Sequence, residues 1–229
     1  MRKLVGLVAA MLTIMPAALV IDALVAEAQA VPVLASKAID NDQVTAWDIT
    51  LKQGQQGPAT PADQDAVILY LEGGTIKSDS TPGSSTDARG FGDAVFVPKG
   101  SNLRETLVKG GPVHEVMVWL KNAKAKTIAN PTKYPTAWPR PGAVKTLEND
   151  RVIAWNYSWL PDRPAPTHFH IHQQVVAYRY DGAIKTIAPD GTATTDEHKA
   201  GEIRFTEPNR LHSEQWDSGR MSAVVLELK

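Results

Sequence analysis

The sequence contains no cysteine among its 229 residues, and this absence removes several classes of protein at once. A chain without cysteine has no disulfide framework, no thiolate metal ligand and no cysteine nucleophile. Its stability must therefore come from the burial of apolar side chains. A chain of this length can bury enough of them for one large domain or two small ones.

Net charge is nearly absent as well, because 24 basic residues face 25 acidic ones and the formal net charge is −1. Proteins that bind nucleic acid or an anionic membrane surface usually carry an excess of positive charge. The charge balance therefore predicts no nucleic-acid partner. The sequence also lacks a Gly-x-Ser-x-Gly elbow, a phosphate-binding glycine loop and a dinucleotide fingerprint, so none of these motifs offers a catalytic centre.

The first thirty residues read as a leader. Two basic residues precede an apolar run that extends to residue 21 and contains Pro16, and a small-x-small sequence ends at Ala30. This pattern predicts a signal peptide over residues 1–30, with a mature chain that is periplasmic or secreted and not held in a membrane. An uncleaved membrane anchor is the alternative, but the proline and the small-x-small end favour cleavage.

The rest of the chain repeats itself. The segment NDQVTAW, which ends at Trp47, recurs as NDRVIAW ending at Trp155, 108 residues later, and Tyr70 and Tyr178 keep the same offset. A long period that occurs twice indicates two copies of one domain. We expect both aromatic pairs to be core residues.

Proline density separates the two copies. Four prolines between residues 131 and 141 exclude a regular helix or a central strand and favour an extended connector. The sequence therefore predicts an N-terminal domain over 31–121, a proline-rich linker over 122–143 and a C-terminal domain over 144–229.

Within each copy the sequence pattern is typical of β-strands. Short runs of β-branched and aromatic residues are bounded by Gly, Pro, Asn or Asp, and no long segment has helical periodicity. This pattern predicts an all-β fold of antiparallel sandwiches or small barrels. The clearest strands are expected at 67–71, 95–97, 175–178, 203–205 and 222–228.

Histidines are few and clustered. The chain has six, and three of them, His168, His170 and His172, occupy alternate positions, while His212 lies alone further on. Alternate residues of a strand share one face. Such a face together with a histidine on a neighbouring strand supplies the ligands of a transition metal. The other reading is a polar strand face with ordinary surface histidines.

The C-terminal copy resembles the cupin superfamily, whose first motif is His-x-His followed by an acidic residue and a glycine, and whose second runs from glycine through proline to histidine. Here the pattern reads His168, His170 and Gly182, then Gly201, Pro208 and His212. The resemblance implies a bicupin, two tandem jelly-roll barrels, with one divalent metal ion bound in the second. It covers nearly all of the mature chain as a fold, but the metal motif only in the C-terminal copy.

Two positions could complete the metal shell. The acidic residue of the first motif is missing, and Gln174 or Val175 stands in its place. Gln174 could offer a neutral carbonyl oxygen. His172 could be a third or alternative ligand, a proton-transfer group at the rim, or a solvent-facing residue. The candidate metal ligands are therefore His168, His170 and His212, with Gln174 or His172.

The N-terminal copy lacks the motif. Thr60, Ala62 and Gln64 stand opposite the alternating histidines, and Leu103 stands opposite His212. We therefore expect at most one metal ion per chain.

Two further side chains are predicted to have no part in the site. Glu214 follows His212 by two residues, but Glu105 occupies the same place in the metal-free copy, so Glu214 is interpreted as a fold residue. His198 belongs to a polar run that predicts an exposed turn.

Together these features predict a cupin that binds one divalent transition metal, with iron, manganese, nickel, copper and zinc not distinguished. The resemblance implies a small-molecule substrate rich in oxygen and a reaction of the dioxygenase, isomerase or lyase type. The alternative is a bicupin that binds a small molecule, or serves as a structural protein, without turnover. The sequence leaves both open. Dimerisation through sheet edges is a further expectation.

Overall fold

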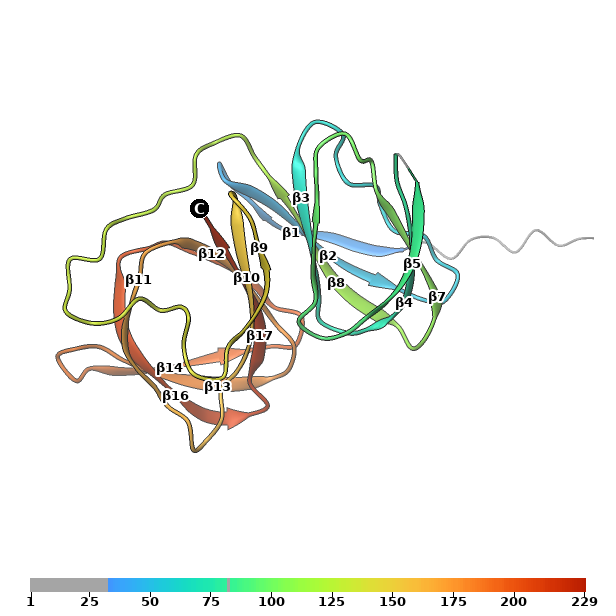
Figure 1. Ribbon diagram of the computed structural model, residues 1–229. Helices are drawn as coiled ribbons and strands as arrows, with labels where there is room; N and C mark the ends of the chain where they lie inside the picture. The colour runs from blue at the N-terminus through green and yellow to red at the C-terminus, as the bar shows by residue number, and fades with distance from the viewer. Residues whose placement is uncertain (1–32, 82) are drawn as a thin grey trace, which may run out of the picture. The chain divides into compact units, whose positions relative to one another are not determined.

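The computed structural model describes residues 33–81 and 83–229, so the predicted signal peptide lies outside the described residues. All regular secondary structure in this part is β-strand, which confirms the predicted all-β fold (Figure 1). No helix within it is long and apolar enough to cross a bilayer. The strands are β1 (Leu34–Asp40), β2 (Val44–Leu51), β3 (Asp65–Tyr70), β4 (Gly74–Asp79), β5 (Ser84–Arg89), β6 (Ala94–Val97), β7 (Arg104–Lys109), β8 (Val113–Leu120), β9 (Val144–Glu148), β10 (Val152–Ser158), β11 (Ala165–His170), β12 (Gln173–Tyr178), β13 (Gly182–Ile187), β14 (Ala193–His198), β15 (Ile203–Thr206), β16 (Arg210–Gly219) and β17 (Ser222–Leu228).

The N-terminal barrel is formed by two antiparallel sheets. One has the strand order β1-β2-β8-β3-β6 and the other β5-β4-β7. Side chains alternate between the two faces of each strand. On β2, Ile49 and Leu51 point into the barrel and pack in one hydrophobic cluster, whereas Val44 and Ala46 belong to a second cluster on the opposite face.

The C-terminal barrel repeats this plan. Its sheets have the orders β15-β12-β17-β10-β9 and β11-β16-β13-β14. The interior is rich in aromatic side chains, including Trp155, Tyr157, Trp159 and Tyr178, all of which are buried. Such side chains bury large apolar areas, and the N–H groups of Trp155 and Trp159 donate to Glu227 and Glu214. They form the wall against which the candidate site is built.

The repeated sequence has a local structural reason. The side-chain oxygen of Asn41 accepts hydrogen bonds from two backbone N–H groups, at 2.9 Å each, and Asn149 makes the same pair at 2.9 and 3.0 Å. Asparagine favours this kind of turn because its side chain can mimic a backbone acceptor. Gly92 and Gly201 are also equivalent, since both have positive φ. The N–H of Gly92 donates to the carbonyl of Tyr70, and that of Gly201 donates to the carbonyl of Tyr178.

The outer faces of the two five-stranded sheets share one apolar cluster. Val67, Val118 and Ala46 from the first barrel and Val175 and Leu226 from the second are all completely buried in it. Burying such apolar side chains stabilises the pairing of the barrels by roughly 25 cal/mol for each Å² removed from water.

Ion pairs border this apolar interface. Arg179 forms a bidentate pair with Glu72 at 2.9 and 3.0 Å, and Arg151 lies 2.7 Å from Asp65. Each pair joins a residue of one barrel to a residue of the other, so the interface is apolar at its centre and charged at its border.

The connector between the barrels lies against the second one (Figure 1). Thr136 bridges to Phe169 of β11 in the parallel sense. Phe169 donates to the carbonyl of Pro135 and accepts from Ala137, both at 2.9 Å. The connector therefore adds a short stretch of backbone to the free side of β11, the strand that carries the alternating histidines.

Candidate metal centre

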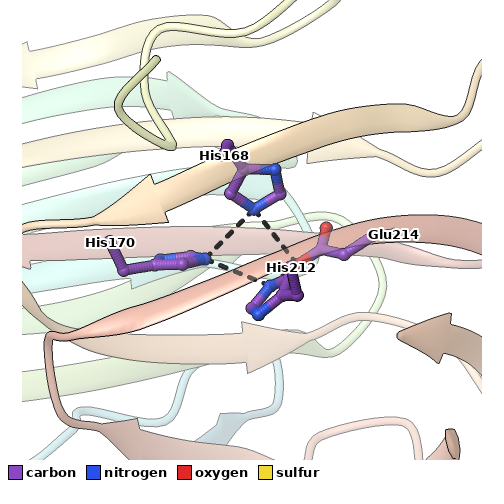
Figure 2. Close-up of side chains that lie close together, drawn as sticks. All are labelled: His168, His170, His212 and Glu214. Atoms are coloured by element: carbon purple, nitrogen blue, oxygen red, sulfur yellow. Dashed lines mark hydrogen bonds and ion pairs between the residues drawn. The ribbon is translucent and has the colours of Figure 1, made fainter. Parts of the chain in front are cut away.

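Four buried side chains converge inside the C-terminal barrel. Figure 2 shows His168, His170, His212 and Glu214 pointing toward one another, and one ligand atom from each lies within 4.8 Å of the others. The first two come from β11, the last two from β16. These strands are hydrogen-bonded neighbours in which His168 faces His212. The pairing register therefore brings residues 42 to 46 positions apart in the sequence to one point.

The distances between the four side chains leave room for one metal ion at the centre. Nε2 of His170 lies 3.2 Å from Nε2 of His168 and 3.3 Å from Nε2 of His212. Oε1 of Glu214 lies 3.0 Å from Nε2 of His212 and 3.8 Å from Nε2 of His168. All three rings thus present the same nitrogen to the same point.

A backbone carbonyl on the side away from the cluster fixes the orientation of the His168 ring. Its Nδ1 lies 2.8 Å from the carbonyl oxygen of Pro166, which can only accept a hydrogen bond. In the neutral ring the proton is therefore on Nδ1, and the lone pair of Nε2 faces the cluster. Metal-binding histidines are commonly fixed in this way by an acceptor on their second nitrogen.

Burial keeps two of the rings neutral. It lowers the pKa of His168 to about 4 and the pKa of His170 well below its ordinary value, because the charged imidazolium loses its hydration inside the barrel. Neutral imidazole is the form that binds a metal ion. At neutral pH these two histidines are therefore uncharged.

Glu214 supplies a fixed negative charge. Its Oε2 accepts from Arg140 at 2.6 Å and from the indole N–H of Trp159 at 2.7 Å, which leaves Oε1 directed at the histidines. Burial alone would raise the pKa of this carboxyl, but Arg140 and the hydrogen bond with His212 hold it well below its usual range. The carboxylate is therefore ionised and oriented.

Arg140 comes from the proline-rich connector. Its guanidinium lies 4.0 Å from the ring centre of Trp138 and 4.9 Å from that of Tyr157, and both the Arg140 and the Glu214 side chains are nearly buried. Cation–π contacts of this kind are stronger when they are desolvated. The connector thus does more than join the barrels, since it supplies the cation that balances the acidic member of the cluster.

The other two predicted ligands lie elsewhere. The Gln174 amide donates to Glu227 at 3.4 Å and accepts from Arg210 at 3.2 Å, and it is not part of the four-residue group. Strand β11 ends at His170, so the alternation stops before His172, whose Nδ1 lies 3.1 Å from the hydroxyl of Thr127. The oxygen ligand in the group comes from Glu214 instead.

One expectation about the surface was wrong. His198 does not lie in an exposed turn, because it ends strand β14 and is 3% exposed. Its ring stacks on Tyr178 with centroids 3.8 Å apart. The polar run that precedes it is exposed as expected, but the stacking partner comes from a distant strand and leaves no mark in the local sequence.

A cavity of about 270 Å³ adjoins the cluster. Glu214 and His212 form part of its wall. The other polar and charged side chains that line it include Asp196, His198, Arg204 and Arg210, and Tyr178 and Trp159 contribute aromatic surface. A cavity of this size accepts only a small molecule. The candidate metal position therefore faces a compact space with several polar groups.

Arg210 gives this space a positive charge. Its guanidinium contacts Nδ1 of His170 at 3.1 Å, Oε1 of Gln174 at 3.2 Å and the hydroxyl of Thr206 at 3.1 Å, and it forms no ion pair with a carboxylate of the described chain. As a donor it assigns the proton of neutral His170 to Nε2, so binding of a metal ion at Nε2 would require the tautomer of His170 and its contact with Arg210 to change.

The N-terminal barrel has hydrogen bonds where the second barrel has the cluster. The hydroxyl of Tyr70 lies 2.7 Å from both oxygens of Glu105, and Ser78 donates to the same carboxylate at 3.1 Å. Leu103, opposite His212 in the repeat, is apolar and nearly buried. Within residues 33–81 and 83–229, the group in the second barrel is the one cluster of at least three histidine or acidic side chains that could hold a metal.

The donor set fits a divalent transition metal. Three imidazole nitrogens and one carboxylate oxygen are the ligand types found in zinc, iron, manganese and copper sites. All four side chains are buried, and the carboxylate offsets part of the ion's charge. The described residues can therefore hold such an ion with no ligand from outside the barrel.

Comparisons with known proteins identify the fold. No family model and no curated protein sequence matches the chain, but many solved structures do. A cupin 2 conserved barrel domain protein from Leptotrichia buccalis is 13% identical with a TM-score of 0.53, over 86% of this chain and 89% of that one. Protein Ylba from E. coli is 12% identical with a TM-score of 0.60, over 85% and 82%.

Oxalate decarboxylase from Bacillus subtilis, a protein with Mn(II) centres, is also similar: 12% identical with a TM-score of 0.58, over 85% of this chain and 71% of that one. At these identities the likeness shows the fold alone. The chain has the fold of cupin jelly-roll barrels, as the resemblance in the sequence implied.

Proposed function

We propose that this protein binds one divalent transition metal ion through His168, His170, His212 and Glu214 and uses it to act on a small organic anion. The observation that supports this most is the convergence of four buried ligand atoms beside a cavity with a cationic wall. When bound, the ion would supply Lewis-acid or oxygen-activating chemistry at that wall.

The residues of the chain account for the selectivity. Arg210 forms no ion pair with a carboxylate of the described chain, and it stands beside His170. A carboxylate or enolate oxygen entering the cavity would pair with it, and such charge-assisted hydrogen bonds are the strong ones. The ligand would therefore be an oxygen-rich anion, the class to which the oxalate of the similar decarboxylase also belongs.

The same cavity contains groups that can move a proton. Asp196 and His198 lie on β14, and both line the space next to His212 and Glu214. Burial lowers the pKa of His198, so its ring is neutral near pH 7 and able to accept a proton. These groups favour turnover over simple binding.

Elemental analysis of the purified chain tests the metal site. Wild-type protein should contain about one equivalent of a transition metal, and His170→Ala should lose it, because removing one of four ligands leaves an incomplete shell. His172→Ala is the matched control and should keep the metal. No metal in the wild type, even after reloading, would refute the site.

Activity is tested separately on the loaded protein. Oxalate is the first probe, with carbon dioxide release and oxygen uptake as readouts, followed by other small carboxylates. Saturable anion binding without turnover of any probe would favour the alternative, a protein that binds a small molecule without catalysis.

We also propose that the chain is exported. The support is the apolar leader over residues 1–30 with its small-x-small end. N-terminal sequencing of the protein recovered from the producing cell would show whether the mature chain begins near residue 31.

A further inference from the structure

Three polar side chains close on one another inside the N-terminal barrel. The hydroxyl of Tyr70 lies 2.7 Å from both oxygens of Glu105, and Ser78 donates to the same carboxylate at 3.1 Å. All three residues are buried, so hydrogen bonds within the protein satisfy groups that water does not reach. In this barrel both hydroxyls are therefore engaged by the carboxylate.

The equivalent positions of the C-terminal barrel hold Tyr178, Thr186 and Glu214. Strand pairing shows the equivalence, because Ser78 faces Glu105 across β4 and β7, just as Thr186 faces Glu214 across β13 and β16. All three residues of the C-terminal barrel line the metal cavity. The N-terminal barrel thus serves as an internal reference for what these positions do when the cluster histidines are absent.

The partners of Glu214 leave the Tyr178 hydroxyl free. Oε2 of Glu214 accepts from Arg140 and Trp159, and its Oε1 lies 3.0 Å from Nε2 of His212. The hydroxyl of Tyr178 forms no hydrogen bond with any residue of the described chain, and protein atoms do not enclose its oxygen. Because Tyr178 is 7% exposed and lines the metal cavity, its hydroxyl is available to a molecule bound there.

A stacked histidine holds the ring of Tyr178 in place. His198 lies against it with centroids 3.8 Å apart and an angle of 18° between the planes. Arg89 is its counterpart in the other barrel, since both residues pair with the glycine that begins the preceding strand, and it lies 5.9 Å from the ring centre of Tyr70. A donor on a fixed ring loses little conformational freedom when a ligand binds.

The phenol of Tyr178 keeps its proton near neutral pH. Burial, together with the negative charge of nearby Glu214, raises the pKa of Tyr178 above its ordinary 10. A protonated phenol donates a hydrogen bond, and donation to a negatively charged oxygen is stronger than donation to a neutral one. Arg204 and Arg210 line the same cavity, so an anion is the kind of ligand that this donor would meet.

We propose that Tyr178 is a substrate-binding residue that donates a hydrogen bond to an oxygen of the anion in the metal cavity. This inference rests on the proposed function, because it takes that cavity as the place where a small organic anion binds. Arg210 supplies the positive charge, and the Tyr178 hydroxyl contacts an acceptor oxygen of the same ligand. The duplication thus turned a tyrosine that holds a carboxylate of its own barrel into one that binds a carboxylate from outside.

Tyr178→Phe tests the proposal, because it removes the hydroxyl and keeps the ring that stacks on His198. Calorimetric titration of the metal-loaded full chain with oxalate, pyruvate and glycolate measures the anion affinity, and elemental analysis measures the metal content. The variant should keep about one equivalent of metal and the unfolding midpoint of the wild type. It should bind the anion that the wild type prefers at least about tenfold more weakly, because one hydrogen bond to a charged group is lost.

Tyr70→Phe is the matched control at the equivalent position. It loses a hydrogen bond to the buried Glu105 carboxylate, so its unfolding midpoint should fall while its anion affinity stays that of the wild type. Tyr180→Phe is a second control, because its ring lies beside Arg179 and Arg220 and does not line the metal cavity. It should match the wild type in anion affinity.

The outcomes separate this inference from the proposed function. Wild-type affinity in metal-loaded Tyr178→Phe would overturn the role of Tyr178 and leave the proposed function standing. Loss of metal from Tyr178→Phe, or an equal loss of affinity in Tyr180→Phe, would also overturn it, because the hydroxyl would then act through the structure. No saturable binding of the three anions to the metal-loaded wild type would contradict the proposed function, and the role of Tyr178 with it.

Discussion

In the absence of metal, the free energy of unfolding of the Arg140→Met variant should be about 3–5 kcal/mol lower than that of the wild type. Arg140 is the cation nearest to the Glu214 carboxylate, at 2.6 Å, and both side chains are nearly buried. Removing it leaves a negative charge inside the barrel with the Trp159 N–H as its remaining donor on that oxygen. Urea denaturation followed by tryptophan fluorescence measures the loss.

Methionine is chosen to isolate the charge. It keeps an unbranched apolar side chain near Trp138 and Tyr157, the rings that the arginine guanidinium contacts, and its sulfur packs well against aromatic rings. Arg163→Met is the matched control, because Arg163 also lies near Tyr157, at 6.0 Å, and donates to a backbone carbonyl, but has no carboxylate partner in the described chain. It should cost only about 1 kcal/mol.

A double variant completes the experiment. Adding Glu214→Gln to Arg140→Met removes the orphaned charge and should restore most of the lost stability, a coupling that a double-mutant cycle measures. Saturating divalent metal should stabilise Arg140→Met more than the wild type, because the ion takes over the role of the cation. Equal losses in Arg140→Met and Arg163→Met would show that the ion pair contributes little.

Glu115→Gln should remove a pH dependence of stability that originates in the other barrel. Glu115 is completely buried, and neither of its oxygens has a hydrogen-bond partner in the described chain. Burial, together with the neighbouring Glu105 carboxyl, raises the pKa of Glu115 well above its ordinary 4.5. Between the unfolded-state and folded-state pKa values, the folded protein therefore holds a proton that the unfolded chain releases.

The sign of the effect follows from this raised pKa. The stability that Glu115 contributes is complete below the unfolded-state pKa and is lost as the pH rises through the folded-state pKa. Between these two pKa values the loss is ~1.4 kcal/mol for each pH unit. The glutamine variant keeps a neutral side chain of similar shape, so its stability should not fall in this way and should exceed that of the wild type at alkaline pH.

Unfolding midpoints in urea from pH 4 to pH 9 measure this difference. Glu197→Gln, at an exposed position of β14, should follow the wild-type profile. Parallel profiles for Glu115→Gln and the wild type would mean that Glu115 does not carry the expected proton.

Strand periodicity and the internal repeat made most of the fold predictable. The alternation of His168 and His170 indicated a shared face, and the strands expected at 175–178 and 222–228 lie within β12 and β17. These are local features, written into consecutive residues. The resemblance to cupins added His212, which pairing of β11 with β16 brings opposite His168.

The role of Glu214 in the cluster could not be predicted from such local features. Its counterpart Glu105 suggested a fold role, but the two carboxylates share a position and have different partners: Tyr70 and Ser78 hold Glu105, while Arg140 holds Glu214. That arginine comes from a connector whose sequence predicts only an extended chain. Its contact is set by the docking of the connector, which no local pattern encodes.

The docking of that connector also covers part of one exposed strand edge of the second barrel. A strand with an unpaired side offers N–H and C=O groups to any other chain, and this is a common route to aggregation. In the described structure, β16 flanks β11 on one side, and the backbone around Thr136 occupies part of the other. The histidine strand is thereby covered by its own chain, and a foreign strand could add there only after displacing the connector.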